Sequence, residues 1–530
     1  MIEFVVNGEP AAVPDDGCSL LEALRDRLGI RSPKDGCSPQ GQCGCCTVWV
    51  DGSARVACVT PVARVAGKRV TTVEGLDDAE AWAESLCASG GSQCGFCTPG
   101  IVMRLAALGA ARDEGAAVET ALRAHLCRCT GWRSIIDAVA AMGGTDEPAH
   151  REQRDLEAAS RRASIEGRTP QTVGPSIALG DGGFASDTAP ADALIALRGA
   201  DGEWVVGETL TAARLLAGRV QGRRTTASLS WPIDVPAGTW TRTLQTTWVE
   251  PAYLEPDTAW CAPGGEPSSA LANGGAFGGK ATSEVGAVAR RLADAHGRPV
   301  VASYTREDTV LLGPKRPPVA GGVDASGAGI LHIARPAADS RGDLLDAIAA
   351  VAPRLDVVFV DVAGPAVSAS LRAGGWAEAA VLTSGLGSSD PGDSDPGTAR
   401  VTSPTRVASP EGAIAEAAID RTPQGSEIVR VDVSCGDVLD ETVLRSYCLG
   451  AAHMALGWVR SEGLAVAEAG APLDRTIRSF GVLSALDTPR VEVRVADGAG
   501  TPVNGSDAVF AAVAAAAWRA ADFAPRWPIS

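Results

Sequence analysis

Eight cysteines of this chain fall into two groups of four. The chain has 14 cysteines in 530 residues, and the two groups have the spacings Cys37-x5-Cys43-x2-Cys46-x11-Cys58 and Cys94-x2-Cys97-x29-Cys127-x-Cys129. Thiolates are soft ligands for iron bridged by sulfide, and a [2Fe–2S] cluster takes four of them. The sequence therefore predicts two [2Fe–2S] clusters, with electron transfer as their chemistry.

The first group lies mostly inside a glycine-rich loop. Three of its cysteines fall within residues 36–46, and the fourth follows a strand-like run at residues 47–50 and an Asp51-Gly52 turn. Glycine has no Cβ, so this backbone can bend around a cluster and aim N–H groups at its sulfurs. The spacing is that of a plant-type ferredoxin with one extra loop residue.

The second group lies at the ends of two expected helices, residues 101–108 and 118–125. One pair of cysteines precedes the first helix, and the other pair follows the second. Pro99 suits a first helical turn, where its missing N–H costs nothing. The helix ends would therefore bring the two pairs together.

Zinc and disulfide bonds are the alternative uses of these cysteines. Zinc sites usually combine two short Cys-x2–4-Cys pairs, and neither group has that form. The N-terminus shows no secretory signal, and no run is long and apolar enough to span a bilayer. A reducing cytoplasm, where disulfides are rare, fits both observations.

The motifs around the cysteines resemble those of a known family. GCSPQGQCGCCTVWVDG, QCGFCTPG and CRCTGW are similar to the iron–sulfur small subunit of the xanthine dehydrogenase/aldehyde oxidase family of molybdenum hydroxylases, over residues 1 to about 145. The resemblance implies a β-grasp ferredoxin domain over residues 1–75 and a four-helix bundle over residues 76–145. It also implies that the bundle cluster lies next to a molybdopterin cofactor and the ferredoxin cluster lies towards FAD.

Three further residues beside the ligands need a role. The family's C-G-x-C-T pattern assigns the ligands to Cys43 and Cys46 rather than to Cys45. The resemblance also implies that Gln93, just before a ligand, contacts the pterin; a surface amide is the alternative. His125 precedes Cys127 by two residues, where a hydrogen bond near the cluster is one role for it; we expect a capping or surface role instead. The other cysteines are expected to be buried small hydrophobes.

The rest of the chain predicts further domains. Its length implies three or four in all. Strand-like runs at 194–197, 357–362 and 491–495 alternate with alanine-rich helical runs at 283–296, 343–351 and 507–521, so the fold class is multidomain α+β. Composition predicts a charged linker over 146–170 and a loop or linker over 385–411, which separates regions 171–384 and 412–530.

A glycine-rich motif, NGGAFGGK at residues 273–280, has two interpretations besides a structural turn. As a P-loop it lacks the Ser or Thr after Lys280, and no apolar strand precedes it. It also resembles the glycine-rich motif of the family's molybdopterin-binding large subunit. That resemblance implies contact with the cofactor by Gly274, Gly275, Phe277 and Gly278.

Residues of about 225–320 and 465–520 look like pieces of that large subunit. The catalytic base of the family's large subunit, however, has no counterpart in this sequence. The family's catalytic base is a glutamate in a G-x-G-E motif, and residues 498–505 here read GAGTPVNG. A water or hydroxide on molybdenum needs a positioned carboxylate to take its proton. We therefore expect no catalytic residue in this chain and interpret residues 171–530 as a degenerate molybdopterin domain that serves assembly.

The net charge of the chain, and the lack of nucleotide-binding motifs, determine which partners we expect. A net charge of −17 argues against nucleic-acid binding, and no FAD or NAD signature is present. We expect an electron-transfer subunit of a molybdenum hydroxylase complex, with a molybdopterin-binding large subunit and an FAD-binding subunit in a heterotrimer or its dimer. The alternatives are a self-contained molybdopterin-binding hydroxylase and a stand-alone iron–sulfur assembly or sensor protein.

Overall fold

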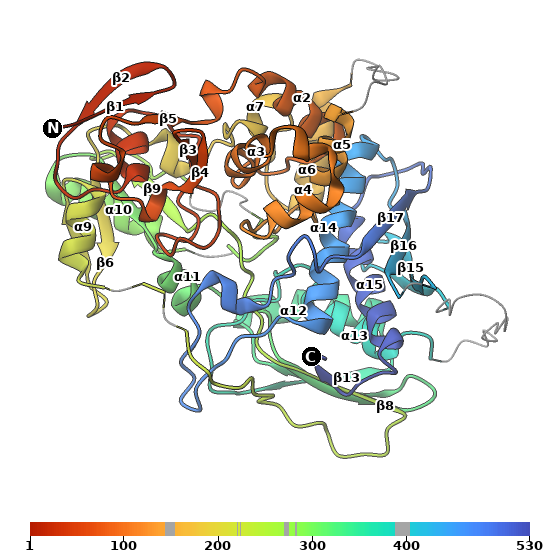
Figure 1. Ribbon diagram of the computed structural model, residues 1–530. Coiled ribbons are helices and arrows are strands. Elements are labelled where there is room, and N and C mark those ends of the chain that lie inside the picture. The colour runs from red at the N-terminus through yellow and green to blue at the C-terminus, as the bar shows by residue number, and fades with distance from the viewer. Residues whose placement is uncertain are drawn as a thin grey trace.

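The N-terminal sheet and a helical bundle lie side by side, and the rest of the chain packs below and beside them (Figure 1). This computed structural model describes residues 1–143, 154–219, 221–222, 224–269, 275–280, 283–386, 403–423 and 425–529. The described residues form four sheets and a set of covering helices. The multidomain α+β class expected from the sequence is confirmed.

The first unit is a five-stranded mixed sheet with the order β2-β1-β5-β3-β4. Strands β1 and β5 are parallel and the other neighbours are antiparallel, which is a β-grasp arrangement. Helix α1 (Leu20–Glu22) begins at Ser19, whose hydroxyl accepts the N–H of Glu22, and continues as a π-helical turn, η1 (Ala23–Arg27). The strands are β1 (Ile2–Val6), β2 (Glu9–Val13), β3 (Thr47–Val50), β4 (Ser53–Val56) and β5 (Arg69–Thr71).

The second unit is a bundle of four helices around buried apolar side chains such as Trp82, Ile101 and Ile135. Pro99 lies in the first turn of α3, as the sequence predicts. The helices are α2 (Ala79–Ser89), α3 (Thr98–Ala106), α4 (Gly115–Leu122) and α5 (Arg133–Gly143).

The prediction of a charged linker over residues 146–170 is wrong for its described part. Residues 156–167 form α6 (Leu156–Gly167), which begins at Asp155, whose carboxylate accepts the N–H groups of Glu157 and Ala158. Arg162 and Glu166 are buried and form an ion pair at 3.0 Å on one face of this helix. The charged residues therefore belong to a packed helix, and their abundance alone did not reveal it. Residues 146–153 of the predicted linker lie outside the described residues.

The third unit is a four-stranded sheet with the order β7-β6-β10-β9. Helix α10 (Val285–His296) covers one face of it, against Leu194, Ala196 and Val300. Helix α9 (Leu210–Ala217) covers part of the other face. The strands are β6 (Leu194–Arg198), β7 (Trp204–Gly207), β9 (Thr258–Cys261) and β10 (Val300–Ser303), and the short helices α7 (Pro175–Ala178) and α8 (Ala185–Thr188) precede them.

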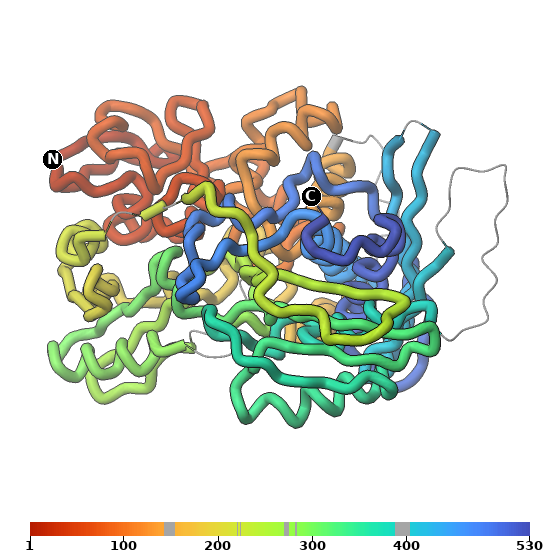
Figure 2. The backbone as a smooth tube through the Cα atoms, turned by 90° about the horizontal axis from the view of Figure 1, so that it is seen from below, coloured from red at the N-terminus to blue at the C-terminus, as the bar shows by residue number. Residues whose placement is uncertain are grey.

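A five-stranded sheet with the order β13-β12-β11-β8-β18 forms the fourth unit. In Figure 2 the tube through β11, β12 and β13 is coloured green to teal, and that through β8 is yellow-green. Its strands are β8 (Arg242–Thr246), β11 (Val319–Val323), β12 (Gly329–Ala334), β13 (Leu355–Val360) and β18 (Arg526–Trp527), and its helices are α11 (Arg306–Leu312), α12 (Arg341–Val351) and α13 (Trp376–Thr383).

The last unit is a four-stranded sheet, β14-β15-β16-β17, covered by two long helices. Its strands are β14 (Thr405–Ala408), β15 (Ile414–Arg421), β16 (Glu427–Ser434) and β17 (Arg490–Val495), and the helices are α14 (Glu441–Arg460) and α15 (Ser506–Ala520). Strand β14 lies inside the predicted loop 385–411. Its buried Thr405 and Val407 alternate with exposed neighbours, a pattern too short to detect beside the polar residues that precede it. Residues 387–402 lie outside the description.

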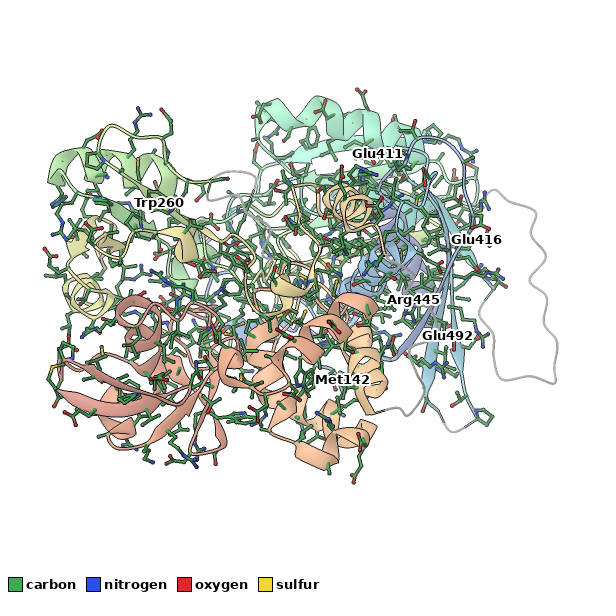
Figure 3. The ribbon with its side chains drawn as sticks, turned by 90° about the horizontal axis from the view of Figure 1, so that it is seen from above. Met142, Trp260, Glu411, Glu416, Arg445 and Glu492 are labelled. Carbon is green, nitrogen blue, oxygen red and sulfur yellow. The ribbon has the colours of Figure 1, made fainter. Side chains whose placement is uncertain are left out.

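Helix α14 of this last unit packs against the helical bundle. Arg445 of α14 forms an ion pair at 3.5 Å with Asp137 of α5, and Figure 3 places Arg445 beside the helix that carries Met142. Gly450 lies at the middle of α14, where an added Cβ would be 1.7 Å from the carbonyl oxygen of Cys129. A glycine in mid-helix therefore permits direct backbone contact with a cysteine of the second group.

Candidate iron–sulfur centres

The first cysteine group converges in the glycine-rich loop between α1 and β3. Its four thiols are buried, and none is more than 6% exposed. The thiol of Cys37 contacts those of Cys43 and Cys58 by hydrogen bonds, which lower the pKa of Cys37 well below its usual value. Cys58 also contacts Cys46. All four predicted ligands, Cys37, Cys43, Cys46 and Cys58, are therefore brought together.

Backbone N–H groups of the loop point at the sulfurs of this group. Those of Gln40 and Gln42 lie 3.3 and 3.4 Å from Cys37 Sγ, and that of Cys58 lies 3.4 Å from Cys46 Sγ. Such donors stabilise negative charge on a thiolate. The expectation that the loop aims N–H groups inward is confirmed.

The second group converges where the bundle helices meet. Cys94 Sγ lies 3.6 Å from Cys129 Sγ, and Cys127 contacts both Cys129 and Cys97 by hydrogen bonds that lower the pKa of Cys127. Thr130 Oγ1 lies 3.2 Å from Cys127 Sγ. None of the four thiols is more than 7% exposed. The predicted set of Cys94, Cys97, Cys127 and Cys129 is also brought together.

These donor sets fit [2Fe–2S] clusters. Each iron of such a cluster takes two thiolates, so pairs of sulfurs must approach one another, as they do in both groups. In the part of the chain that the structure describes, no three His, Cys, Asp or Glu side chains are arranged to hold a single metal ion. The geometry favours two dinuclear centres, each with four buried thiols.

Cys45 lies beside the first group and contacts one predicted ligand, Cys43, by a hydrogen bond between the two thiols. It is fully buried, and burial raises the pKa of its thiol. A Cβ built on Gly36 would lie 3.1 Å from Cys43 Sγ, 3.1 Å from Cys45 Sγ and 3.2 Å from the ring of Phe96. Gly36 therefore lets the loop pack closely against Cys45 and against a residue of the second group's loop.

The two groups are joined through the backbone. The N–H of Leu126, next to Cys127, donates a 3.0 Å hydrogen bond to the carbonyl oxygen of Cys43. At the same junction, a Cβ on Gly100 of α3 would lie 2.3 Å from the carbonyl oxygen of Gly44. Only glycine allows this approach, so the sequence places the two centres in contact through their own loops.

His125 fills the centre of this junction, and the expectation of a capping or surface role is wrong. It is 1% exposed, and its Nε2 lies 3.2 Å from Thr47 Oγ1 and 3.1 Å from the Gly100 carbonyl oxygen. Burial lowers the pKa of His125 to about 3, so the ring is neutral. Gly44, at φ +80°, packs against it: an added Cβ would lie 2.4 Å from the ring. The glycine of the Cys43-Gly44-Cys45-Cys46 run was the one feature of the sequence that could have indicated a bulky neighbour there.

Gln93 is buried, so its alternative as a surface amide is wrong. Its Nε2 donates to the carbonyl oxygen of Cys129 at 3.0 Å and to Ser446 Oγ of α14 at 2.9 Å. Its Oε1 is buried and has no hydrogen-bond donor in the described part of the chain. Gln93 therefore connects the second group to α14.

The described part of the glycine-rich motif packs against the second group. A Cβ on Gly275, at φ +83°, would lie 3.1 Å from Cys129 Sγ, and one on Gly278 would lie 1.8 Å from the Ser370 carbonyl oxygen. Phe277 is buried beneath the guanidinium of Arg372, 4.0 Å from the ring centroid. Gly274 lies outside the described residues.

Lys280, which ends the motif, is already paired. Its ammonium lies 2.7 Å from Glu255 Oε2, and both side chains are buried. Burial raises the pKa of Glu255 to about 7, although Lys280 opposes the shift. A lysine held in this way does not fit the phosphate-binding role of a P-loop lysine.

The sequence has known relatives over its N-terminal quarter. Residues 72–140 match the family described as "[2Fe-2S] binding domain". The alpha subunit of isoquinoline 1-oxidoreductase from Brevundimonas diminuta is 38% identical over 146 residues, which are 95% of that protein and 26% of this chain. Xanthine dehydrogenase from Drosophila subobscura is 41% identical over 155 residues, but the match spans only 12% of its length.

The chain belongs to the molybdenum hydroxylase family. Its fold resembles that of the aldehyde oxidoreductase of Desulfovibrio gigas, with a TM-score of 0.68, 14% identity and 97% of each chain covered. The aldehyde oxidoreductase of Desulfovibrio desulfuricans gives a TM-score of 0.67 at 15% identity. Within this family, the region of the chain that its sequence relatives match is the N-terminal quarter, which contains the [2Fe-2S] binding domain.

The cavity beside the described part of the glycine-rich motif is small. The cavity there has a volume of about 30 Å³, whereas small-molecule sites typically enclose roughly 300 Å³ or more. Arg128 lines this cavity and forms a bidentate pair with Glu462. Its Nη1 and Nη2 atoms donate to Oε1 and Oε2 of Glu462, each at 2.6 Å. Sequence reasoning missed this buried pair, because its partners lie 334 positions apart.

The segment that lacks the family's glutamate receives a carboxylate from elsewhere. Glu166 of α6 accepts the N–H groups of Gly505 and Ser506 at 3.0 and 2.9 Å, at the start of α15. It is also paired with Arg162 and is 1% exposed. Glu166 is therefore engaged both in capping α15 and in the ion pair with Arg162.

Within the described residues, no helix combines the length and apolar character needed to cross a membrane.

Proposed function

We propose that this chain is the electron-transfer iron–sulfur subunit of a molybdenum hydroxylase complex. Electrons from a molybdopterin-binding large subunit would enter at the bundle cluster, pass to the ferredoxin cluster and leave to FAD in a third subunit. Each [2Fe–2S] cluster, when bound, accepts one electron at a time. The hydrogen bond from Leu126 to Cys43 carries this proposal, because it joins the two cysteine groups through bonded atoms.

The chain's own residues provide a short route between the clusters. From Cys127 the route follows the backbone to the Leu126 N–H, crosses one 3.0 Å hydrogen bond, and continues through the Cys43 carbonyl to its side chain. His125 packs beside this route and is held neutral. The ring of His125 therefore fills the space beside the route and excludes water from it.

The same residues would tune the clusters. The N–H groups of Gln40 and Gln42 point at Cys37, and the hydroxyl of Thr130 lies next to Cys127. Dipoles directed at ligand sulfurs favour the reduced, more negative form of a cluster. Burial opposes added charge, so the two influences together set each potential.

One ligand of the ferredoxin group has an exposed neighbour, which would suit the place of this group at the end of the route. Val59 follows the ligand Cys58 and is 51% exposed. Gly41 lies under Val59, where an added Cβ would be 3.1 Å from the valine side chain. The bundle group, by contrast, lies beneath α14 and the glycine-rich motif.

Residues 171–530 would act as a scaffold for the two centres. Arg306 of α11 donates to the carbonyl oxygen of Gly36 in the ferredoxin loop, and Arg478 donates to that of Gln42 at 3.0 Å. Gln40 bonds to the Arg475 carbonyl and accepts the N–H of Ile477. These contacts hold the ligand loop without needing a cofactor in the scaffold.

A self-contained molybdopterin-binding hydroxylase is the second candidate. The likeness to aldehyde oxidoreductase over nearly the whole chain favours it. The cavity of about 30 Å³ and the absence of a carboxylate at residues 498–505 favour the scaffold. Metal analysis of the full chain purified alone separates them: we expect iron without molybdenum, and molybdenum near one equivalent would overturn the scaffold proposal.

The route is tested by replacing Leu126 with proline, which has no N–H to donate. The matched control is Leu126→Ala, which shortens the side chain but keeps the donor. After pulse reduction of one cluster, we expect electron exchange between the clusters to be slower in Leu126→Pro and unchanged in Leu126→Ala. Equal rates in all three proteins, with both cluster signals intact, would contradict the proposed route.

The place in a complex is tested by purification from the native host. We expect flavin-containing and molybdopterin-containing subunits to accompany the chain. If the chain purifies with both clusters and with neither subunit, a stand-alone assembly or sensor protein becomes the better description.

A further inference from the structure

A cavity of about 260 Å³ lies between the ferredoxin unit and the sheet β7-β6-β10-β9. We name it the cluster-side cavity, because its lining includes residues adjacent to ligands of both cysteine groups. Ser38 follows Cys37, and Phe96 lies between Cys94 and Cys97. The ring of Phe96 also reaches Gly36, beside Cys43 and Cys45. A molecule in this cavity would be one residue away from both proposed clusters.

The two long walls of the cluster-side cavity are apolar. One is the sheet face beside α9, where Ile195 of β6 and Val301 of β10 are register partners and Ile195 also packs against the α9 cluster. The opposite wall includes Leu21 of α1 and Phe96. Facing apolar walls suit a flat ring system, since both faces of a ring can then be removed from water.

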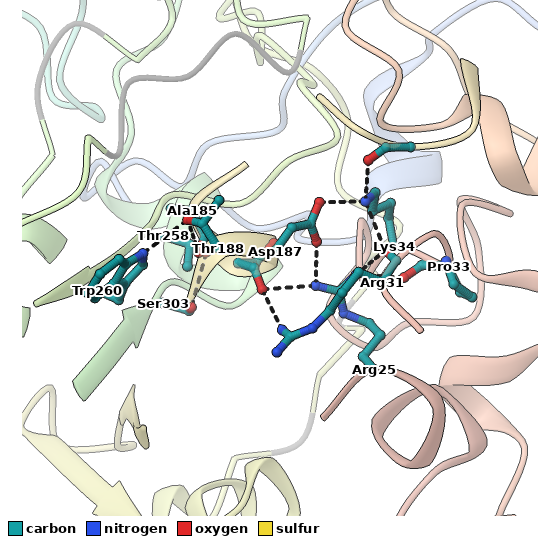
Figure 4. A network of polar contacts seen from close by, with 12 residues as sticks. Arg25, Arg31, Pro33, Lys34, Ala185, Asp187, Thr188, Thr258, Trp260 and Ser303 are labelled. Carbon is teal, nitrogen blue, oxygen red and sulfur yellow. Dashed lines mark hydrogen bonds and ion pairs between the residues drawn. The ribbon is translucent and has the colours of Figure 1, made fainter. Parts of the chain in front are cut away.

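The edge of the cavity carries an arginine with unused hydrogen-bond donors. Arg31 Nη1 donates to the carbonyl oxygen of Ser186 at 2.9 Å, and Arg31 forms no ion pair with any described carboxylate. The neighbouring Arg25 and Lys34 both bind Asp187, at 2.7 and 2.5 Å, so that carboxylate is already used (Figure 4). Arg31 is therefore available to a ligand oxygen at the cavity edge.

One carboxyl group on the lining has a pKa near neutral. Glu255 lines the cavity, and burial raises its pKa to about 7. Asp26 also lines it and is exposed to solvent. The cavity thus combines apolar walls, a hydrogen-bond donor and a proton-exchanging group next to the electron route.

We propose that the cluster-side cavity binds a planar aromatic electron acceptor of the quinone class, with its ring between Ile195 and Phe96 and a carbonyl oxygen bound by Arg31. The volume suits one small ring system and is too small for a nucleotide cofactor. Acidic residues on the lining make an anionic ligand unfavourable. The binding part stands alone, whereas the reduction step rests on the electron-transfer function proposed above.

The reduction step balances with groups already named. The two electrons would be supplied by the two clusters when bound and reduced, one electron from each. The quinone takes up these two electrons and two protons, and both of its carbonyl groups become hydroxyl groups. Glu255 delivers one proton and is reprotonated from solvent, and the second proton comes from solvent past Asp26 at the cavity lining.

Binding is tested on the full chain with oxidised clusters, so that no electron transfer contributes. The probe is tetramethyl-1,4-benzoquinone, whose ring positions are all substituted so that it cannot add to thiols. We expect saturable one-site binding by calorimetry. Ile195→Trp, which fills the cavity, should abolish it, and Arg31→Gln should weaken it roughly tenfold, the worth of a hydrogen bond to a charged group.

Matched controls separate these effects from general damage. Val358→Trp adds the same ring at an exposed strand position, and Arg64→Gln removes an exposed arginine of the ferredoxin unit; neither residue lines the cavity. Both should bind the quinone like the unmodified chain. Binding that is absent from the unmodified chain, or that survives in Ile195→Trp at full strength, would overturn the proposal.

Electron delivery is tested by anaerobic single turnover. The chain is reduced with dithionite, freed of excess reductant and mixed with the quinone. We expect about one quinol per chain, with loss of both reduced-cluster signals. Ile195→Trp should retain its reduced clusters. If the quinone binds but the clusters stay reduced, the reduction step is refuted while the site stands; if the clusters are absent, the proposed function itself fails.

Discussion

Glycines decide how closely the two cysteine groups approach. Gly44 lies against the ring of His125, and Gly100 lies against the carbonyl oxygen of Gly44. Both approaches are too close for a residue with a Cβ atom. The sequence indicated that glycines shape the first loop. It did not indicate their partners, because the atoms they meet belong to another unit of the chain.

Gly100→Ala should separate the two centres. An added methyl group would be forced against the carbonyl oxygen of Gly44, and overpacking of this kind typically costs about 1–3 kcal/mol. We expect a lower thermal unfolding midpoint and a weaker magnetic interaction between the two reduced clusters by EPR. Gly115→Ala, at a position with open space around it, is the control and should change neither.

Cys94→Ser tests the assignment of the bundle ligands. Serine is a poor ligand for this soft site, so one of two distinguishable reduced-cluster EPR signals should disappear. The signal of the ferredoxin cluster should remain. Cys448→Ser changes a buried cysteine outside both groups and should leave both signals in place; an unchanged spectrum for Cys94→Ser would refute the ligand set.

Glu255 predicts a particular pH dependence of stability. Burial raises its pKa from about 4.5 to about 7, so the folded chain binds this proton more tightly than the unfolded chain does. The contribution of Glu255 is therefore full below pH 4.5 and is lost as the pH rises to 7, by roughly 3 kcal/mol.

Glu255→Gln has no such proton to lose. We expect the unfolding midpoint of the unmodified chain, measured relative to that of the variant, to fall between pH 5 and pH 7. A difference that stays constant across this range, or one that grows with pH, would show that Glu255 does not have a raised pKa in the folded chain.

Among the elements, α6 shows how a charged sequence can form part of the core. Its Arg162–Glu166 pair is fully buried, and Glu166 also accepts the N–H groups that begin α15. Removing one partner of a buried pair leaves an uncompensated charge. The prediction of a linker failed here because sequence composition does not show which charges find partners.

Glu166→Ala should therefore destabilise the chain by about 3–5 kcal/mol. Glu157→Ala on the same helix is the matched control, because Glu157 forms only an exposed pair with Arg161 and should cost less than about 1 kcal/mol. Urea unfolding followed by circular dichroism compares the two. Similar losses in both variants would contradict the role assigned to Glu166.

Elements with a strong local pattern were predicted well. The alanine-rich runs at 283–296, 343–351 and 507–521 correspond to α10 (Val285–His296), α12 (Arg341–Val351) and α15 (Ser506–Ala520). The strand-like runs correspond to β6, β13 and β17. Periodicity and composition are local properties, so they identify such elements without knowledge of their neighbours.

At the scale of the whole molecule, the cysteine groups could be predicted but their surroundings could not. Spacing alone identified the eight thiols that the structure brings together. Gly450 and Gly275 cover the bundle group, and both are far from its cysteines in the sequence. The cluster-side cavity is also lined by segments that are distant in the sequence. Such contacts leave no periodic signal in a single sequence.

The most direct test of the account is a redox titration of the full chain, freshly isolated without oxygen and monitored by EPR alongside iron and acid-labile sulfide analysis. Two clusters predict about four atoms each of iron and sulfide per chain. They also predict two reduced signals that broaden when both clusters carry an electron, because the centres are neighbours. A single signal, or far less iron and sulfide, would contradict the account.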